Sequence, residues 1–227
     1  MNGERKIENN EIKYLSSGLC FILFLFLSSV SFACDLEGHF DFNVSDINEE
    51  ILYAGCYDAI NMGPHLIEYI LTKERLEGEH VRRPSAMFTQ NRDGGILMEL
   101  LAEHGYTLPH HRDYRNSGYD RGHMAPNADF NNTLENALMT FFIANIWPQT
   151  PNVNRVEWLA AETETRRLAI EYSFIKIIII VDEFSEEKIN EKISIPLCFK
   201  KRVYDLYTGD LIYEIDVYQG LLTGEDE

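Results

Sequence analysis

The amino-acid sequence predicts a mixed α+β fold whose sheet is mainly antiparallel and carries flanking helices. Short apolar runs separated by turn residues recur along the chain, a pattern typical of strands joined by loops. Residues 152–172 contain neither glycine nor proline and form the best helix candidate. The β-branched run at residues 174–181 is typical of a buried strand. Together these elements predict one folded domain at residues 51–227.

The N-terminal residues have the pattern of a secretory signal peptide. Two lysines precede an apolar run at residues 19–27, and small residues follow it up to Ala33. We therefore expect residues 1–33 to be removed, so that the mature chain begins at Cys34 and is secreted or periplasmic. The apolar stretch is shorter than the roughly 20 residues of a membrane span, so no stable membrane association is expected after cleavage. A retained anchor and a lipid on Cys34 are the alternatives.

The segment that follows the leader, residues 34–50, is polar and acidic, and we expect it to be a lead-in to the folded domain. Three cysteines would remain after cleavage, namely Cys34, Cys56 and Cys198, and the sequence leaves their pairing open. A bridge between Cys34 and Cys56 is the simplest arrangement in an oxidising compartment. No C-x-x-C spacing occurs, which gives a structural zinc site little support.

The overall charge restricts the function classes. The formal net charge is −17, whereas contacts to nucleic-acid phosphates normally come from lysine and arginine. This charge argues against a protein that binds nucleic acid by wrapping tightly around it. It is weaker evidence against a hydrolase, which needs only a local positive cluster and a metal ion at the scissile phosphate.

The first half of the domain is expected to contain a hairpin and a helix. Apolar runs at residues 52–57 and 66–71, with turn residues between them, predict two paired strands. Apolar residues at helical spacing predict a helix at residues 94–104. A polar loop then extends to Tyr119.

The second half of the domain is expected to contain the long helix and most of the strands. An apolar run predicts a strand at residues 141–147, just before that helix. Asn154 and Glu157 have the spacing of a capping pair, so we expect the helix to begin near Asn154. Strands are also expected in three ranges after the buried run, at residues 193–199, 203–207 and 212–217.

The sequence Asp-Arg-Gly-His at residues 120–123 contains the main catalytic candidates. In a strand, Arg121 and His123 point to the same face, and Gly122 lets the backbone approach a ligand. An imidazole beside a guanidinium suits phosphodiester hydrolysis, in which one group activates water and another holds the phosphate. Taken alone, His123 would more often be a structural histidine.

A second set of candidates recurs every four residues on the long helix, at Asn154, Trp158, Glu162 and Arg166. This spacing places an amide, a carboxylate and a guanidinium on one face. Magnesium prefers oxygen ligands and keeps several waters, so Asn154 and a substrate phosphate could complete its coordination. Manganese has similar preferences, and the sequence does not separate the two ions. Taken singly, Asn154 is explained as a helix cap and the Glu162–Arg166 pair as a surface ion pair.

These motifs resemble the DNA/RNA non-specific endonuclease family, whose fold is the ββα-metal, or His-Me finger, arrangement. The resemblance rests on the box at residues 120–123, on Pro148-Gln149 and on Asn154-x-x-x-Trp158-x-x-x-Glu162. The Ile195-Pro196 strand with Lys200 also looks like the family's. The similar region runs from about Gly55 to Asp205.

The resemblance implies the catalytic roles. His123 would be the general base, Asn154 would bind the metal directly, and Glu162 would position metal-bound waters. The cofactor would be Mg²⁺, with Mn²⁺ as the other candidate, and the substrates would be DNA and RNA. The expected products carry 5′-phosphate and 3′-hydroxyl ends.

The resemblance also implies which residues contact the substrate. Arg121 and Arg166 would stabilise the phosphate, and Asn145 would contribute to substrate binding. Some members use an additional upstream arginine, and either Arg82 or Arg83 could supply it here.

Two other functions compete with an exported endonuclease. The acidic composition motivates a catalytically inactive family member that acts as a secreted binding module. A cysteine at the expected cleavage point motivates a lipid-anchored envelope protein with a structural role. Replacement of His123 by alanine separates the first two hypotheses, because only an enzyme would lose its function.

Overall fold

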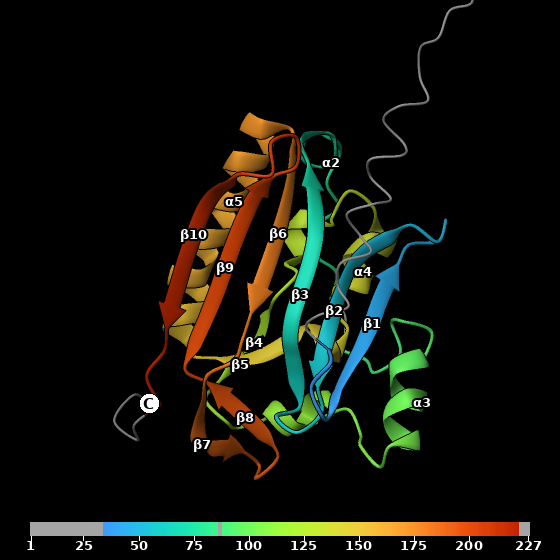
Figure 1. The fold of residues 1–227 in the computed structure, drawn as a ribbon, viewed down its shortest axis with the longest axis vertical. Coiled ribbons are helices and arrows are strands. Elements are labelled where there is room, and N and C mark those ends of the chain that lie inside the picture. Colours follow the sequence, from blue (N-terminus) through green and yellow to red (C-terminus); the bar gives the residue numbers. More distant parts are fainter. Residues whose placement is uncertain (1–33, 86–87, 223–227) are drawn as a thin grey trace, which may run out of the picture.

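The main sheet of the computed structural model is antiparallel throughout (Figure 1), and the structure describes residues 34–85 and 88–222. Within those ranges the sheet has six strands in the order β1-β2-β3-β6-β9-β10. The fold class predicted from the sequence is therefore confirmed. The strands are β1 (His39–Ser45), β2 (Ile51–Asp58), β3 (Gly63–Thr72), β6 (Phe174–Ile180), β9 (Cys198–Asp205) and β10 (Leu211–Tyr218).

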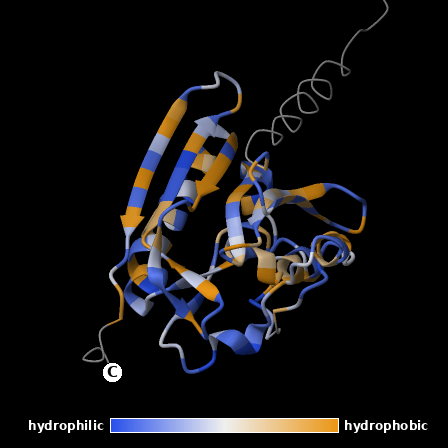
Figure 2. Ribbon diagram, turned by 60° about the horizontal axis from the view of Figure 1, so that its bottom comes forward, coloured by the Kyte–Doolittle hydropathy of each residue, from blue (hydrophilic) through white to orange (hydrophobic). Residues whose placement is uncertain are grey.

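The centre of the sheet is held by the isoleucine-rich strand β6, which lies between β3 and β9. Ile175, Ile177 and Ile179 point to one face and are buried, as expected for alternate residues of a strand. On the other face, Lys176 forms an ion pair with Glu68 of β3 at 2.8 Å. Figure 2 shows bands of apolar and polar residues along other strands of the sheet, whereas β6 is apolar apart from Lys176.

Strand β1 corrects the prediction that residues 34–50 are only a polar lead-in. Phe42 and Val44 are buried and alternate with polar neighbours, so this segment forms the edge strand beside β2. The many acidic residues around it masked that period of two in the sequence. The expected Cys34–Cys56 disulfide is present and ties the start of the described chain to β2. Among the described cysteines, Cys198 is buried and outside any disulfide.

The helices lie around this sheet, with the longest, α5 (Trp158–Tyr172), packed along one face (Figure 1). The helix predicted at residues 94–104 is present as α3. The bounds of the shorter α-helices are α2 (Lys73–Glu77), α3 (Ile96–Glu103) and α4 (Leu134–Met139). Short helical turns are η2 (His111–Tyr114), η3 (Asn127–Asp129), η4 (Ile143–Asn145) and η5 (Val153–Glu157). Within the described ranges, no helix has the length and apolar character of a membrane span. The expected signal peptide lies outside the described residues.

Two small antiparallel pairs complete the fold within the described chain, β4 with β5 and β7 with β8. Their bounds are β4 (Asp120–His123), β5 (Ile146–Gln149), β7 (Phe184–Ile189) and β8 (Ile193–Pro196). The strand expected at residues 141–147 begins only at Ile146, because the preceding residues form the turn η4. The strand expected at residues 193–199 is divided, since β8 pairs with β7 whereas β9 pairs with β6.

The long helix begins earlier than its capping pattern predicts. Pro151 is already helical, and the Thr150 hydroxyl accepts a hydrogen bond from the Val153 N–H at 3.3 Å. Proline suits the first helical position because a backbone N–H at that position would have no acceptor within the helix, so its absence costs nothing. Asn154 therefore lies inside the first turn rather than at the cap. The N–H of Trp158 bonds to the Val153 carbonyl, which makes η5 a π-helical turn.

Candidate active site

The Asp-Arg-Gly-His box forms β4, whose register against β5 pairs Asp120 with Gln149 and His123 with Ile146. Alternate residues of a strand share a face, so Arg121 and His123 lie together, as predicted. Gly122 has a different role from the expected one. A Cβ atom at this position would collide with the Gln149 side chain. The glycine therefore makes room for Gln149 instead of for a ligand.

His123 lies in an aromatic environment with its backbone tied to the long helix. Its ring centroid is 5.2 Å from that of Phe88 and 5.5 Å from that of Phe141. The indole N–H of Trp158 donates to its carbonyl oxygen at 3.1 Å. Its Nε2 atom is buried and has no hydrogen-bond partner among the described residues. Burial, with a smaller contribution from the charge of Arg83, lowers the pKa of His123 to about 3, so the imidazole is neutral.

Arg121 lies beside His123 and is held by the loop before the box. Its Nε and Nη2 atoms donate to the His111 carbonyl at 3.2 and 2.7 Å. The guanidinium carbon is 6.0 Å from the centre of the Phe88 ring, which also contacts His123. The structure thus brings together the guanidinium and the imidazole that the sequence singled out.

Asn154 is oriented by the first residue of the box. Its Nδ2 atom donates to Asp120 at 2.9 Å, and Arg155 donates to both oxygens of the same carboxylate at 2.8 Å. Partial burial alone would raise the pKa of Asp120, but these hydrogen bonds and the charge of Arg155 lower it. Because the Nδ2 atom faces Asp120, the amide oxygen of Asn154 is directed away from that carboxylate. This oxygen is the kind of donor that Mg²⁺ accepts.

Glu162 and Arg166 form the predicted pair one turn apart on α5, with 3.9 Å between the carboxylate and the guanidinium. Arg166 also contacts the buried Asp129 at 3.0 Å. Burial raises the pKa of Glu162 to about 7, with Lys201 and Arg166 opposing the shift and Asp129 adding to it. This carboxyl group therefore titrates near neutral pH.

Of the two upstream arginines, the structure brings Arg83 to the site. Its guanidinium lies 5.7 Å from the centre of the Phe141 ring, which in turn contacts His123. The charge of Arg83 also lowers the pKa values of His123 and Glu162. No comparable contact to the site is present for Arg82 within the described ranges.

Asn145 does not occupy the position predicted for a substrate contact. It is fully buried. Its amide accepts from the Ala125 N–H at 2.8 Å and donates to the carbonyls of Ala125 and Thr140 at 2.9 and 3.1 Å. Asn145 therefore supports the backbone just after His123, because these bonds engage its amide with the main chain.

Two charged residues of the site were not anticipated from the sequence. Lys201 is fully buried, with its Nζ atom 4.3 Å from the centre of the Trp158 ring. The neighbouring Lys200, which the resemblance had singled out, points outward and pairs with Asp182 at 2.8 Å. Asp129 was also missed. Strand alternation would have separated the two lysines had the position of β9 in the sheet been known.

The donor set suits a metal that needs few protein ligands. Within the described ranges, no group of three or more His, Cys, Asp and Glu side chains could hold a metal ion. The predicted oxygen donors are the Asn154 amide, whose side chain contacts the box, and the Glu162 carboxylate two turns further along the helix. Hard ions that retain several waters fit such a set.

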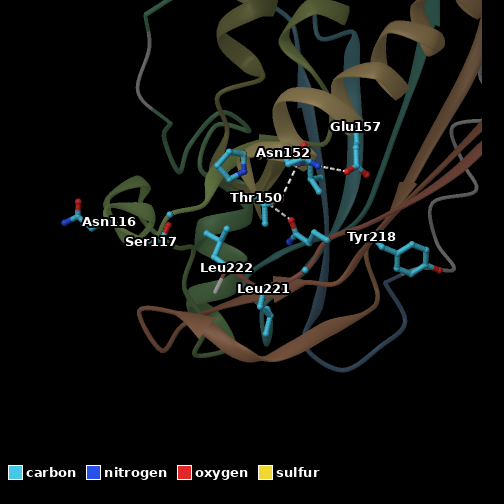
Figure 3. A pocket seen from close by; sticks show the side chains of 13 residues that line it. Asn116, Ser117, Thr150, Asn152, Glu157, Tyr218, Leu221 and Leu222 are labelled. Carbon is cyan, nitrogen blue, oxygen red and sulfur yellow. Dashed lines mark hydrogen bonds between the residues drawn. The ribbon is translucent and has the colours of Figure 1, made fainter. Parts of the chain in front are cut away.

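A separate cavity of about 610 Å³ lies at the start of the long helix (Figure 3). It is lined by residues 116–118, 150–153, 157 and 218–222. Figure 3 shows Asn152 bonded to Glu157 within this cavity, at 2.6 Å. The predicted catalytic side chains do not line it, so the candidate active site is distinct from this hollow.

Most of the chain, including this site, is similar to known nucleases. Residues 37–214 match the model described as DNA/RNA non-specific endonuclease. The chain is 30% identical over 125 residues to the mitochondrial endonuclease G of Homo sapiens, covering 55% of this chain and 39% of that protein. It is 28% identical over 157 residues to the mitochondrial nuclease of Saccharomyces cerevisiae, covering 67% and 45%. The chain thus spans less than half the length of these relatives.

The chain is also similar to a nuclease of Nostoc sp. and to one solved structure. A nuclease of Nostoc sp. is 49% identical over 55 residues, which cover 24% of this chain and 20% of that protein. The structure of an EndoG/EndoGI complex superposes with a TM-score of 0.59 at 24% identity, covering 77% of this chain and 74% of that chain. This likeness supports the predicted ββα-metal fold, in which β4, β5 and the long helix form the ββα unit.

Proposed function

Because the chain belongs to the DNA/RNA non-specific endonuclease family, we propose that it is a metal-dependent endonuclease that hydrolyses the phosphodiester bonds of DNA and RNA. The observation that carries the proposal is that Arg121 lies on the same strand face as His123, whose Nε2 atom has no hydrogen-bond partner in the described part of the chain. Hydrogen bonds from Trp158 to the His123 carbonyl, and from Asn154 and Arg155 to Asp120, dock the long helix onto this strand.

His123 acts as the general base in this proposal. Its neutral imidazole has a nitrogen lone pair free to take a proton from the attacking water. A pKa of about 3 would make it a weak base in the free protein. A phosphodiester anion placed beside the ring favours the imidazolium form, so the pKa should rise when substrate binds.

Asn154 would hold Mg²⁺, or Mn²⁺, through its amide oxygen, and Glu162 would orient water molecules beside the ion. Bound there, the ion would supply positive charge to the phosphate and to the departing 3′-oxygen. Asp120 accepts a hydrogen bond from Nδ2 of Asn154 and so keeps the amide oxygen of Asn154 directed away from its own carboxylate, toward the proposed metal position. Cleavage in this geometry leaves 5′-phosphate and 3′-hydroxyl ends.

Three arginines supply the local positive charge that the acidic chain otherwise lacks. Arg121, Arg83 and Arg166 come from a strand, an upstream loop and the long helix. Guanidinium groups match phosphate geometry through paired N–H donors. Three such groups acting on one phosphate would let a protein with a formal net charge of −17 bind a polyanion at one place.

We also propose that the enzyme is exported and acts in the periplasm or outside the cell. The proposal is supported by the apolar run of the leader and by the small residues that precede the expected cleavage after Ala33. The leader also carries three acidic and three basic side chains. Mitochondrial transit peptides are instead rich in arginine and poor in acidic residues. Mass spectrometry of the N-terminus from fractionated cells tests this proposal. A mature chain beginning at Cys34 in the exported fraction supports it, whereas an intact leader on protein retained in the cytoplasm contradicts it.

The activity is tested by digesting plasmid DNA and RNA with protein produced from the full-length chain, with Mg²⁺ and with a chelator. His123→Ala is expected to lose at least about a hundredfold in cleavage rate, since general-base catalysis contributes that much. The matched control is His104→Ala, which removes an exposed histidine at the end of α3. Folded wild-type protein that cleaves neither substrate with any divalent ion would leave the inactive binding module as the better hypothesis.

A further inference from the structure

A buried carboxylate connects the main sheet to the candidate phosphate contact on the long helix. Asp129 is 1% exposed and lies in the turn η3, six residues beyond His123. One of its oxygens accepts from the Tyr69 hydroxyl of β3 at 2.8 Å. The other accepts from Nη1 of Arg166 on α5 at 3.0 Å. Three elements that are distant in the sequence therefore meet at this carboxylate.

Such a group is costly to bury unless its oxygens are bonded. An unpaired carboxylate in a protein interior loses its hydration without compensation, and the hydroxyl and the guanidinium supply that compensation here. Asp129 and Tyr69 are buried, and the Tyr69 hydroxyl and both Asp129 oxygens are already hydrogen-bonded, so neither side chain offers a polar atom to a substrate. An effect of either residue on cleavage must therefore pass through another group.

Arg166 is the member of this chain of contacts that reaches solvent, with 21% of its side chain exposed. Its Nη2 atom also donates to the Thr163 hydroxyl at 3.3 Å. Because a guanidinium is planar and rigid, fixing it at Nη1 and Nη2 also fixes the direction of its remaining N–H groups.

We propose that Asp129 and Tyr69 are positioning residues, which hold the Arg166 guanidinium in the orientation that contacts the scissile phosphate. The inference rests on the proposed function, which gives Arg166 that contact. Tyr69 keeps the carboxylate from rotating, and the carboxylate in turn fixes the arginine. Without the Tyr69 hydroxyl, one oxygen of Asp129 loses its partner and the arginine loses a defined anchor.

The chain offers a close control for this test. Tyr53 and Tyr69 are both buried, and their rings lie 5.9 and 5.3 Å from that of Phe130. The Tyr53 hydroxyl, however, donates to the Met139 carbonyl and does not contact Asp129. Tyr53→Phe and Tyr69→Phe therefore each remove one buried hydroxyl beside the same ring. Both changes are milder than replacing Asp129, which would remove its 3.0 Å ion pair with Arg166.

Rates of cleavage of a short DNA duplex and thermal unfolding are measured for both variants, made in the full-length chain. Similar small decreases in Tm are expected, since each variant loses one buried hydrogen bond. Only Tyr69→Phe should lose activity, by about tenfold in kcat/KM, which corresponds to one charge-assisted contact in the transition state. Equal activity of the two variants would overturn the proposal.

A double-mutant cycle separates positioning from a merely structural role. Tyr69→Phe is repeated in an Arg166→Ala background, where the hydroxyl should no longer affect kcat/KM. The same loss in both backgrounds would show that Tyr69 does not act through Arg166 and would overturn the inference alone. If the wild type does not cleave, or if Arg166→Ala cleaves as well as the wild type, the proposed role of Arg166 fails and the inference falls with it.

Discussion

Glu162 should make the metal-free protein less stable as the pH rises, and Glu162→Gln should remove this effect. Burial raises the pKa of Glu162 from 4.5 to about 7, and its side chain is only 13% exposed. Each pKa unit corresponds to about 1.4 kcal/mol, so ionisation of this group should cost the folded state about 3 kcal/mol at alkaline pH.

The direction follows from the order in which the two states ionise. Below the unfolded pKa, Glu162 is protonated in both states and has no effect on the free energy of unfolding. Between the two pKa values, only the unfolded chain loses its proton, so stability falls as the pH rises. Above the folded pKa, both states are ionised and the loss is complete. Glutamine stays neutral throughout and shows none of this dependence.

Urea unfolding with a chelator, at about pH 5 and about pH 8, measures the effect. The stability of Glu162→Gln relative to the wild type should increase by about 2 to 3 kcal/mol between these two conditions. Titrating groups that do not interact with Glu162 behave alike in both proteins, so their contributions cancel in the difference. A stability difference that stays constant with pH would refute the assigned environment of Glu162.

Two further predictions follow from the packing around the box. Gly122→Ala should lower the free energy of unfolding by about 1 to 3 kcal/mol, because its Cβ collides with Gln149. Adding Gln149→Ala should restore part of this loss in a chemical unfolding experiment, and a lack of rescue would contradict the contact. Arg83→Ala should cleave DNA about tenfold more slowly than the wild type, whereas Arg82→Ala should not. Equal losses in plasmid digestion would contradict the choice of Arg83.

The sequence alone predicted the parts of the site that depend on local spacing. The period of two in a strand was enough to place Arg121 beside His123, and the period of the helix was enough to pair Glu162 with Arg166. Both predictions concern neighbours within one element. They needed no knowledge of how the elements pack.

The features of the site that the sequence did not reveal depend on contacts between elements. Asn145 lies in the family's motif, yet its amide bonds to a backbone segment twenty residues away in the sequence. Lys200 and Lys201 are adjacent, and only the pairing of β9 with β6 decides which of them is buried. The contact of Asp129 with Tyr69 joins residues sixty positions apart, and no local pattern indicates it.

The start of the long helix shows a third kind of difference. The spacing of Asn154 and Glu157 fits a capping pair, but the helix begins one turn earlier, at Thr150 and Pro151. Asn154 is thereby released from capping, and its amide bonds to Asp120 instead. Its place near the start of the helix was predicted, while its position inside the first turn and the partner of its side chain were not.

The disulfide between Cys34 and Cys56 limits what the N-terminus of a mature chain can carry. A cysteine sulfur forms either a disulfide or a thioether to a lipid, so a chain with this bridge cannot also carry a thioether-linked lipid on Cys34. The bridge needs an oxidising compartment. A chain retained among reducing thiols would therefore lack the covalent tie to β2. A change in gel mobility on adding reductant would show that the bridge had formed. Such a molecule had reached an oxidising compartment and carries no thioether-linked lipid on Cys34.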